Sequence, residues 1–216
     1  MDMREQIVEY GRMLLREHFT IETWGNISAK GPDGLIYITP SGMDYDICTA
    51  DDIIVMTTDK KIVSGSRKPS IETDMHLAIY KARPEVGAVI HSHPMFSTVF
   101  ACMGETVPIG ICDESAQVLG AETKTAKYGL PGSPELMTNC LEALGSVSNA
   151  CLLQSHGAVT VGADLKAAFK VLRVLEMTLE VYYRIRSMGA AFLPISEGNI
   201  KAMQEYVVTQ YGQPKE

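Results

Sequence analysis

Three histidines follow two apolar segments of this chain. His91 and His93 come after segment 86–90, which is typical of a buried strand, and His156 comes after the apolar segment 151–154. Side chains alternate along a strand, so His91 and His93 share a face, about 7 Å apart at a rise of ~3.3 Å per residue. With His156 from a neighbouring strand, the imidazoles could hold one ion and leave an open position, as in catalytic zinc sites. Half-exposed polar residues at strand ends would give the same pattern, and the pattern alone does not decide.

A carboxylate lies near the predicted start of a helix. This helix begins at Ser70 and continues through Ile79, which places Glu72 in its first turn. An acid there complements the helix dipole and needs no further role. The same position suits a general base whose ionised form is favoured by the dipole and a nearby cation. His76, one turn further on, is predicted to make a structural hydrogen bond, and His18 to lie on the surface at a helix end.

Three short segments are rich in the small and polar residues that can enclose an anion. They are residues 25–28, 39–42 and 68–70, and the third ends at a predicted helix N-terminus. Free amides and the positive end of the dipole favour phosphate at such a terminus. Ordinary turns and caps use the same residues, so each segment alone is a weak signal. Only their convergence on the histidines would make a phosphate pocket.

Helices and strands are mixed along the chain without a regular βαβ array. An α/β fold follows, in which helices flank a central, mostly antiparallel or mixed sheet as an α/β/α layered sandwich. At ~100–200 residues per domain, one domain over 1–216 is expected. The predicted helices are 3–18, the one from Ser70, 94–103, the one from Ser133, 163–187 and the one from Ser196. The predicted strands are 35–38, 53–56, 61–63, 86–91, 151–154 and 158–161.

Composition and charge exclude several classes of protein. Ordinary globular usage, with 46% apolar and 21% charged residues, excludes a disordered or fibrous chain. A net charge of −7 argues against a dedicated binder of nucleic acid or of anionic membranes. No apolar run approaches the ~20 residues of a membrane span, and no secretory signal is visible. Five scattered cysteines fit free, buried thiols in a reducing compartment, so a cytoplasmic protein is expected.

Taken together, five segments resemble the class II aldolase/adducin family, and within it the L-fuculose-1-phosphate aldolases. The segments are 23–28, 38–42, 68–72, 89–93 and 152–157, in the family's order and at its spacing over nearly the whole chain. The resemblance implies an α/β/α fold with a largely antiparallel sheet and one Zn²⁺ per subunit. It also implies a homotetramer with active sites at the subunit interfaces.

The resemblance assigns roles to individual residues. Zinc ligands are matched by His91, His93, His156 and Glu72, and Glu72 then acts as the base. Tyr211 is similar to the tail tyrosine that protonates the aldehyde oxygen. The implied reaction is reversible cleavage of a ketose 1-phosphate, such as L-fuculose 1-phosphate, through a metal-stabilised enediolate. Its products are dihydroxyacetone phosphate and a short aldehyde such as lactaldehyde. The phosphate-binding positions are matched by Gly25, Asn26, Ser41, Gly42, Ser70 and Ile71.

Two departures from the family pattern leave the substrate open. Ile71 stands where a second serine is frequent, and residues 111–114 replace a tyrosine that lines the aldehyde pocket, with no role assigned to Asp113 or Glu114. Pentulose-5-phosphate 4-epimerases resemble the chain but have an aspartate in place of Glu72. Methylthioribulose-1-phosphate dehydratase is another enzymatic alternative. Adducin-like interaction modules share the fold without activity, but they lack the zinc histidines.

Overall fold

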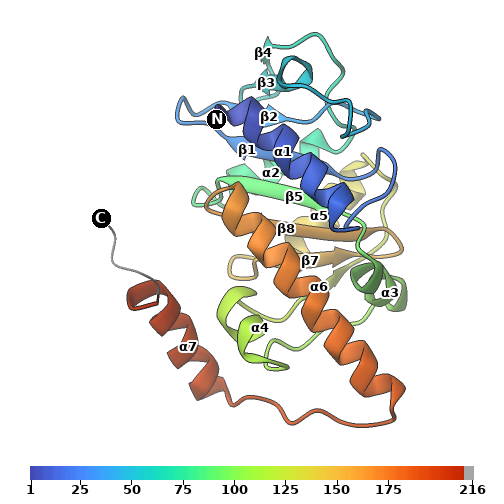
Figure 1. The fold of residues 1–216 in the computed structure, drawn as a ribbon, viewed down its shortest axis with the longest axis vertical. Coiled ribbons are helices and arrows are strands. Elements are labelled where there is room, and N and C mark those ends of the chain that lie inside the picture. The colour runs from blue at the N-terminus through green and yellow to red at the C-terminus, as the bar shows by residue number, and fades with distance from the viewer. Residues whose placement is uncertain (212–216) are drawn as a thin grey trace.

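One eight-stranded sheet forms the centre of the computed structural model, which describes residues 1–211 (Figure 1). The strand order is β4-β3-β2-β1-β5-β8-β7-β6, and every neighbouring pair is antiparallel except β6 and β7. The predicted α/β layered fold with a mostly antiparallel sheet is therefore confirmed. The strands are β1 (Asn26–Lys30), β2 (Ile36–Ile38), β3 (Ile54–Met56), β4 (Ile62–Ser64), β5 (Ala88–Ser92), β6 (Thr125–Ala126), β7 (Ala150–Leu153) and β8 (Gly157–Gly162).

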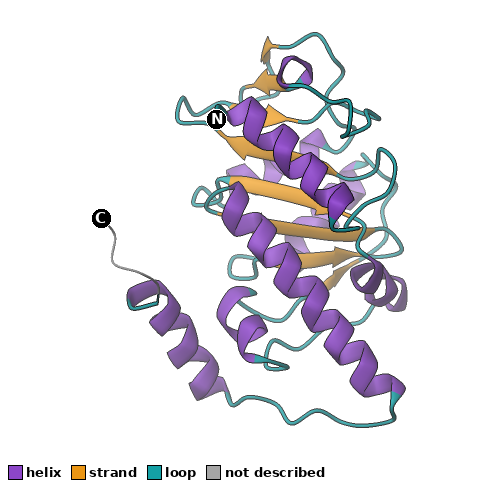
Figure 2. Ribbon diagram, in the orientation of Figure 1, coloured by secondary structure: helices purple, strands orange, loops and turns teal. Residues whose placement is uncertain are grey.

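Helices cover both faces of this sheet, which makes three layers (Figure 2). On one face lie α1 (Met3–Arg16) and α6 (Leu165–Ser187), whose apolar side chains pack on β1, β5 and β8. On the other face, α2 (Thr73–Ala82) and α5 (Pro134–Leu144) pack against β2, β3, β7 and β8. The strands in the middle are buried on both faces, which explains why segments such as 86–90 are continuously apolar.

Polar residues fix where the main helices begin. Asp2 and Glu5 form a reciprocal capping box at the start of α1. Ser133 caps α5 with Pro134 in its first turn, and Asp164 caps α6. These residues satisfy backbone amides that would otherwise lack partners, so the helix starts are readable from the sequence.

Shorter helices complete the layers. The 3₁₀ helix η1 (Ala50–Asp52) precedes β3, and α3 (Met95–Met103) and α4 (Asp113–Val118) lie on the α6 side of the sheet. The last helix, α7 (Glu197–Thr209), follows an extended segment and has no buried residue (Figure 1). It lies beside α4, where the Gln204 side chain donates to the carbonyl oxygens of Ala116 and Gly120. Within the described part of the chain, no helix has the length and apolarity that crossing a membrane requires.

Most predicted elements are present, but four were missed and two residues lie elsewhere than expected. The sequence prediction missed β1, α4, η1 and the two-residue β6. Glu72 is the residue before α2 and does not lie in the first turn of that helix. The expectation of buried thiols holds for Cys48, Cys140 and Cys151, while Cys102 is exposed.

Candidate metal centre

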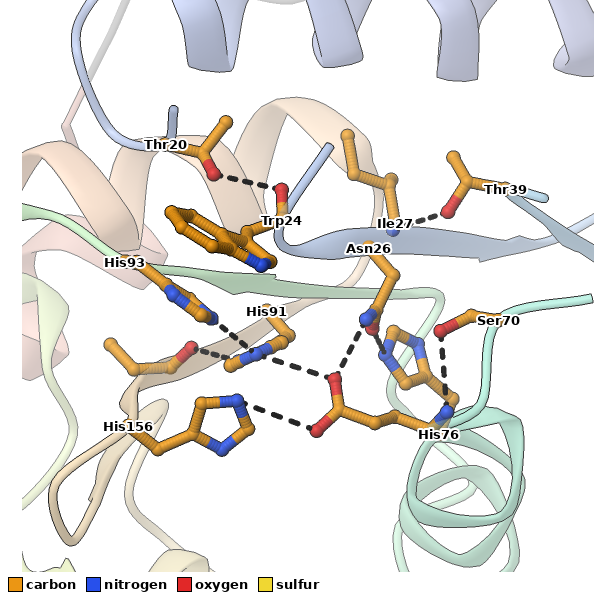
Figure 3. A network of polar contacts seen from close by, with 12 residues as sticks. Thr20, Trp24, Asn26, Ile27, Thr39, Ser70, His76, His91, His93 and His156 are labelled. Carbon is orange, nitrogen blue, oxygen red and sulfur yellow. Dashed lines mark hydrogen bonds and ion pairs between the residues drawn. The ribbon is translucent and has the colours of Figure 1, made fainter. Parts of the chain in front are cut away.

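Two turns at the same edge of the sheet bring the three histidines together. His91 lies in β5 opposite Val159 of β8, and His93 follows directly after β5. His156 lies in the tight turn from β7 to β8, where Ser155 has a left-handed backbone with φ 55°. One nitrogen from each imidazole lies within 4.8 Å of the others (Figure 3). The pairing of β5 with β8 and the turn from β7 to β8 thus place His156 beside His91 and His93, as the sequence predicted.

Two glycines permit this close approach. A Cβ on Gly157 would lie 2.4 Å from the carbonyl oxygen of Ser92 and 2.9 Å from the His93 ring. Gly25 has φ +78°, and a Cβ there would lie 2.7 Å from the carbonyl oxygen of His91. All three distances are shorter than real Cβ contacts, so glycine is required where these turns pass the histidine strand.

The imidazoles are neutral near pH 7, the form that ligates a metal. Burial lowers the pKa of His91 to about 4. Burial and the neighbouring imidazoles lower the pKa of His93 to about 3, and burial and His91 lower that of His156 to about 4. His91 donates from Nδ1 to the carbonyl oxygen of Ala158 at 3.0 Å, so its Nε2 lone pair faces the other two rings. A buried cluster of neutral donors fits a divalent ion.

Glu72 supplies a fourth donor beside the imidazoles. Its Oε2 lies 3.3 Å from Nε2 of His91, and its Oε1 lies 3.7 Å from Nε2 of His156. The side chain is only 4% exposed, and Oε1 makes no hydrogen bond with the described residues. Buried polar atoms are normally hydrogen-bonded, so an unpartnered oxygen and three lone pairs in one place fit a cation.

A buried hydrogen-bond chain holds Glu72 in place. Asn26 donates from Nδ2 to Oε2 of Glu72 at 2.8 Å, which leaves Oδ1 of Asn26 to accept from Nε2 of His76 at 2.6 Å. Nδ1 of His76 therefore lacks a proton and accepts from the Ser28 hydroxyl at 2.6 Å. Ser28 in turn accepts from the Tyr80 hydroxyl at 2.9 Å. His76 thus has the structural role predicted for it, and burial lowers its pKa to about 3.

The three polar segments converge on the same cavity, which has a volume of about 430 Å³. Ser41 donates its backbone N–H to the carbonyl oxygen of Lys68, and Ser70 donates to that of Thr39, so two of the segments are fastened side by side. These polar segments therefore line the same cavity as the cluster of imidazoles and carboxylate. All six predicted phosphate-binding residues line it, together with Thr23, Trp24, Pro40, Pro131, Glu72 and the three histidines.

The structure does not bring every predicted site residue to this cavity. Tyr211 follows α7, is 65% exposed and packs against Tyr206, and it is not among the residues that line the cavity in its own chain. Asp113, in α4, instead lines a separate cavity with residues of α7. Sequence reasoning gave no role to Trp24 or Pro131, which do line the metal cavity. The signals that could have found Trp24 are its place in the family-like segment 23–28 and its adjacency to Gly25.

Comparison with known proteins defines the class of this chain. Residues 5–183 match the model of the family described as Class II Aldolase and Adducin N-terminal domain. The chain therefore belongs to the class II aldolase and adducin family.

Similar proteins share most of the chain's length. A 5-deoxy-D-ribulose 1-phosphate aldolase of Bacillus thuringiensis is 32% identical over 187 residues, or 86% of each chain. A 5-methylthioribulose-1-phosphate/5-deoxyribulose-1-phosphate aldolase of Rhodospirillum rubrum is 35% identical over 182 residues, which cover 84% of this chain and 80% of the relative. A solved structure of an L-fuculose 1-phosphate aldolase has a TM-score of 0.89, with 30% identity over 95% of both chains.

Proposed function

We propose that this protein is a metal-dependent aldolase that reversibly cleaves a ketose 1-phosphate to dihydroxyacetone phosphate and a short aldehyde. The observation that carries the proposal is one cavity lined by two chemically different groups of residues. One group consists of three neutral imidazoles and a partly unpartnered carboxylate, and the other of glycine- and serine-rich turns beside them. A sugar phosphate needs such a pair of subsites, one for its carbonyl and one for its phosphate. The named activities of the similar proteins support the same class of substrate.

His91, His93, His156 and Glu72 would hold the ion, with Zn²⁺ as the expected metal because nitrogen-rich sets of this kind suit it. The bound ion would supply Lewis acidity at the carbonyl group of the substrate. The low pKa values of the histidines keep their lone pairs available across the neutral range. The phosphate-binding turns would orient the substrate so that its reacting carbon faces Glu72.

Glu72 is the base in this proposal. In the synthetic direction it takes the proton from the carbon next to the carbonyl of dihydroxyacetone phosphate, and that carbon then bonds to the aldehyde. Cleavage is the reverse, with Glu72 returning the proton. Asn26 holds one oxygen of the carboxylate, while the other makes no hydrogen bond with the described residues and is free to exchange a proton.

Tyr211 does not line the cavity of its own chain, so it would donate a proton to the aldehyde oxygen only by entering the cavity of a neighbouring subunit. It stands at the end of α7, a helix without buried residues that lies beside α4 of its own chain, on the part of the molecule away from the metal cavity. We therefore propose a homo-oligomer, with a homotetramer expected, in which the α7 arm of one subunit reaches the site of another.

The test supplies dihydroxyacetone phosphate and Zn²⁺ together with acetaldehyde, lactaldehyde or (methylthio)acetaldehyde, and identifies the ketose phosphates formed. These aldehydes correspond to 5-deoxyribulose, fuculose and methylthioribulose 1-phosphates cut between the third and fourth carbons. Efficient use of one aldehyde would identify the substrate. Formation of none, with epimerisation of a pentulose 5-phosphate instead, would refute the aldolase proposal.

Glu72→Gln tests the assignment of the base separately from the metal. The variant keeps the shape of the side chain and can keep the contact with Asn26, so we expect bound Zn²⁺ but little turnover. Metal content by elemental analysis and single-turnover rates would be measured together. Unchanged turnover would remove Glu72 from this role.

A further inference from the structure

The chain has one tryptophan, and it lies against a histidine of the candidate metal centre. Trp24 is 53% exposed and lines the cavity next to Gly25. Its indole is nearly parallel to the imidazole of His93, with 9° between the planes and 6.3 Å between the ring centroids (Figure 3). This separation is in the range of offset-stacked aromatic pairs.

The histidines differ in what fixes their rings. A metal-bound histidine usually donates its second ring N–H to an acceptor, and this bond sets the orientation of the ring. His91 follows the rule, because its Nδ1 donates to the carbonyl oxygen of Ala158. His93 does not, since its Nε2 faces Nε2 of His91 and its Nδ1 makes no hydrogen bond with the described residues. Nδ1 of His156 likewise makes no hydrogen bond with the described residues, so His91 alone has the usual bond. Beside the His93 ring lie the edge-on rings of His91 and His156 and, nearly parallel to it, the face of Trp24.

Backbone contacts fasten the segment that carries Trp24 to the strand that carries His93. His93 donates its backbone N–H to the carbonyl oxygen of Phe19 at 2.9 Å. The Thr20 hydroxyl donates to the carbonyl oxygen of Trp24 at 2.8 Å, and Trp24 donates its N–H to the carbonyl oxygen of Ile21. The positions of the two rings are therefore set by the same short segment.

We propose that Trp24 is a positioning residue that holds His93 in its metal-binding orientation by stacking, in place of the usual hydrogen bond. The inference rests on the metal centre of the proposed function. An imidazole that donates to a cation becomes electron-poor, and the electron-rich face of an indole then stabilises it further. The stack consequently favours the metal-bound form.

The affinity for Zn²⁺, measured by competition with a chromogenic chelator, tests this role without an activity assay. Trp24→Ala should weaken binding by about tenfold, the lower end of the usual effect of losing an orienting partner. Trp24→Phe keeps an aromatic face and should restore most of the affinity. Ile21→Ala is the matched control, because it removes a large, exposed side chain from the same segment without touching the ring of His93. Circular dichroism would verify that each variant is folded.

Fluorescence gives a second readout, because Trp24 is the only tryptophan in the sequence and is the source of all tryptophan emission. Paramagnetic Co²⁺ bound by His93 would lie beside the indole, so one equivalent should quench most of the tryptophan emission of the wild type. Zn²⁺ added first should prevent this quenching.

Three results would overturn the inference: wild-type Zn²⁺ affinity in Trp24→Ala, an equal loss in Trp24→Phe, or an equal loss in Ile21→Ala. Unchanged emission at full Co²⁺ occupancy would also contradict it. A wild-type chain that binds no Zn²⁺ would refute the metal centre itself along with the role of Trp24. If Zn²⁺ binds tightly and its affinity does not change with the residue at position 24, only the role of Trp24 is refuted.

Discussion

The hydroxyl of Ser28 is the link in the buried chain that can be removed with the least change of shape. It joins the Tyr80 hydroxyl to Nδ1 of His76, and the side chain is fully buried. Ser28→Ala leaves the Tyr80 hydroxyl without its acceptor and Nδ1 of His76 without its donor. An unsatisfied buried polar group costs roughly 1–3 kcal/mol. The expected loss is therefore about 3 kcal/mol of the free energy of unfolding, a large share of the ~5–15 kcal/mol of a typical domain.

Urea denaturation at one fixed protein concentration, followed by circular dichroism, measures this loss. With a slope of about 2–3 kcal/mol per molar urea, the midpoint should fall by about 1–1.5 M. The slope itself should not change, because the folded structure remains compact. A fixed concentration matters because an oligomer's stability depends on it.

Ser92→Ala is the matched control. Ser92 lies in the neighbouring strand β5, is equally buried, and its hydroxyl makes no hydrogen bond with the described residues. Burial of an unpaired hydroxyl is unfavourable, so its removal should leave stability unchanged or raise it by up to about 1 kcal/mol. The reasoning would be refuted by equal losses in the two variants, or by a Ser28→Ala protein as stable as the wild type.

Further predictions concern the protonation of His76, the start of α3, Tyr211 and the binding of Zn²⁺. Because folding lowers the pKa of His76 from 6.5 to about 3, the unfolded chain binds a proton that the folded chain does not, and stability should fall as the pH drops below 6.5, by roughly 3 kcal/mol at pH 4.5 from this residue. The three metal-site histidines act in the same direction, so the non-titrating His76→Gln should reduce this dependence without abolishing it, in urea titrations at both pH values. Glu176 accepts from the backbone N–H groups of Phe96 and Ser97 at the start of α3, so Glu176→Ala should cost about 1–2 kcal/mol and Glu176→Gln less, seen as falls in Tm. Tyr211→Phe should lower kcat more than it raises KM. A change in KM alone would indicate that the segment around Tyr211 covers the bound substrate and does not donate a proton. Zn²⁺ at about 100 times its Kd should stabilise the protein by about 2.7 kcal/mol, and a chelator should reverse this in a thermal scan.

Much of the fold follows from local patterns that physical chemistry reads directly. The helical spacing of apolar residues and the caps at Asp2, Ser133 and Asp164 locate α1, α5 and α6. The continuous apolar runs locate the central strands. These signals are local, because a cap or an apolar face is satisfied within a few residues or by any apolar layer.

Strand β1 was missed because its pattern is not apolar. Asn26 and Ser28 are polar, and such residues in sequence are typical of a turn. In the structure both are buried, because their side chains bond to Glu72, His76 and Tyr80, which lie 46 to 52 residues further along the chain. Only the packing of α2 against β1 supplies these partners, so no local pattern could have predicted the strand.

For the site, the sequence determined which chemistry is available, and tertiary structure decided how it is arranged. Residue types and alternation were enough to pair His91 with His93, to nominate His156 as a third ligand and to suggest Glu72 as a base, and the family resemblance added Glu72 to the ligands. The antiparallel pairing of β5 with β8 brings His156 to His91 and His93. The start of α2 places Glu72 beside these imidazoles, where Asn26 of β1 donates to it. The segment before β1 lays Trp24 beside His93. Distances between residues far apart in sequence depend on which surfaces pack together, and a chain's local preferences do not specify them.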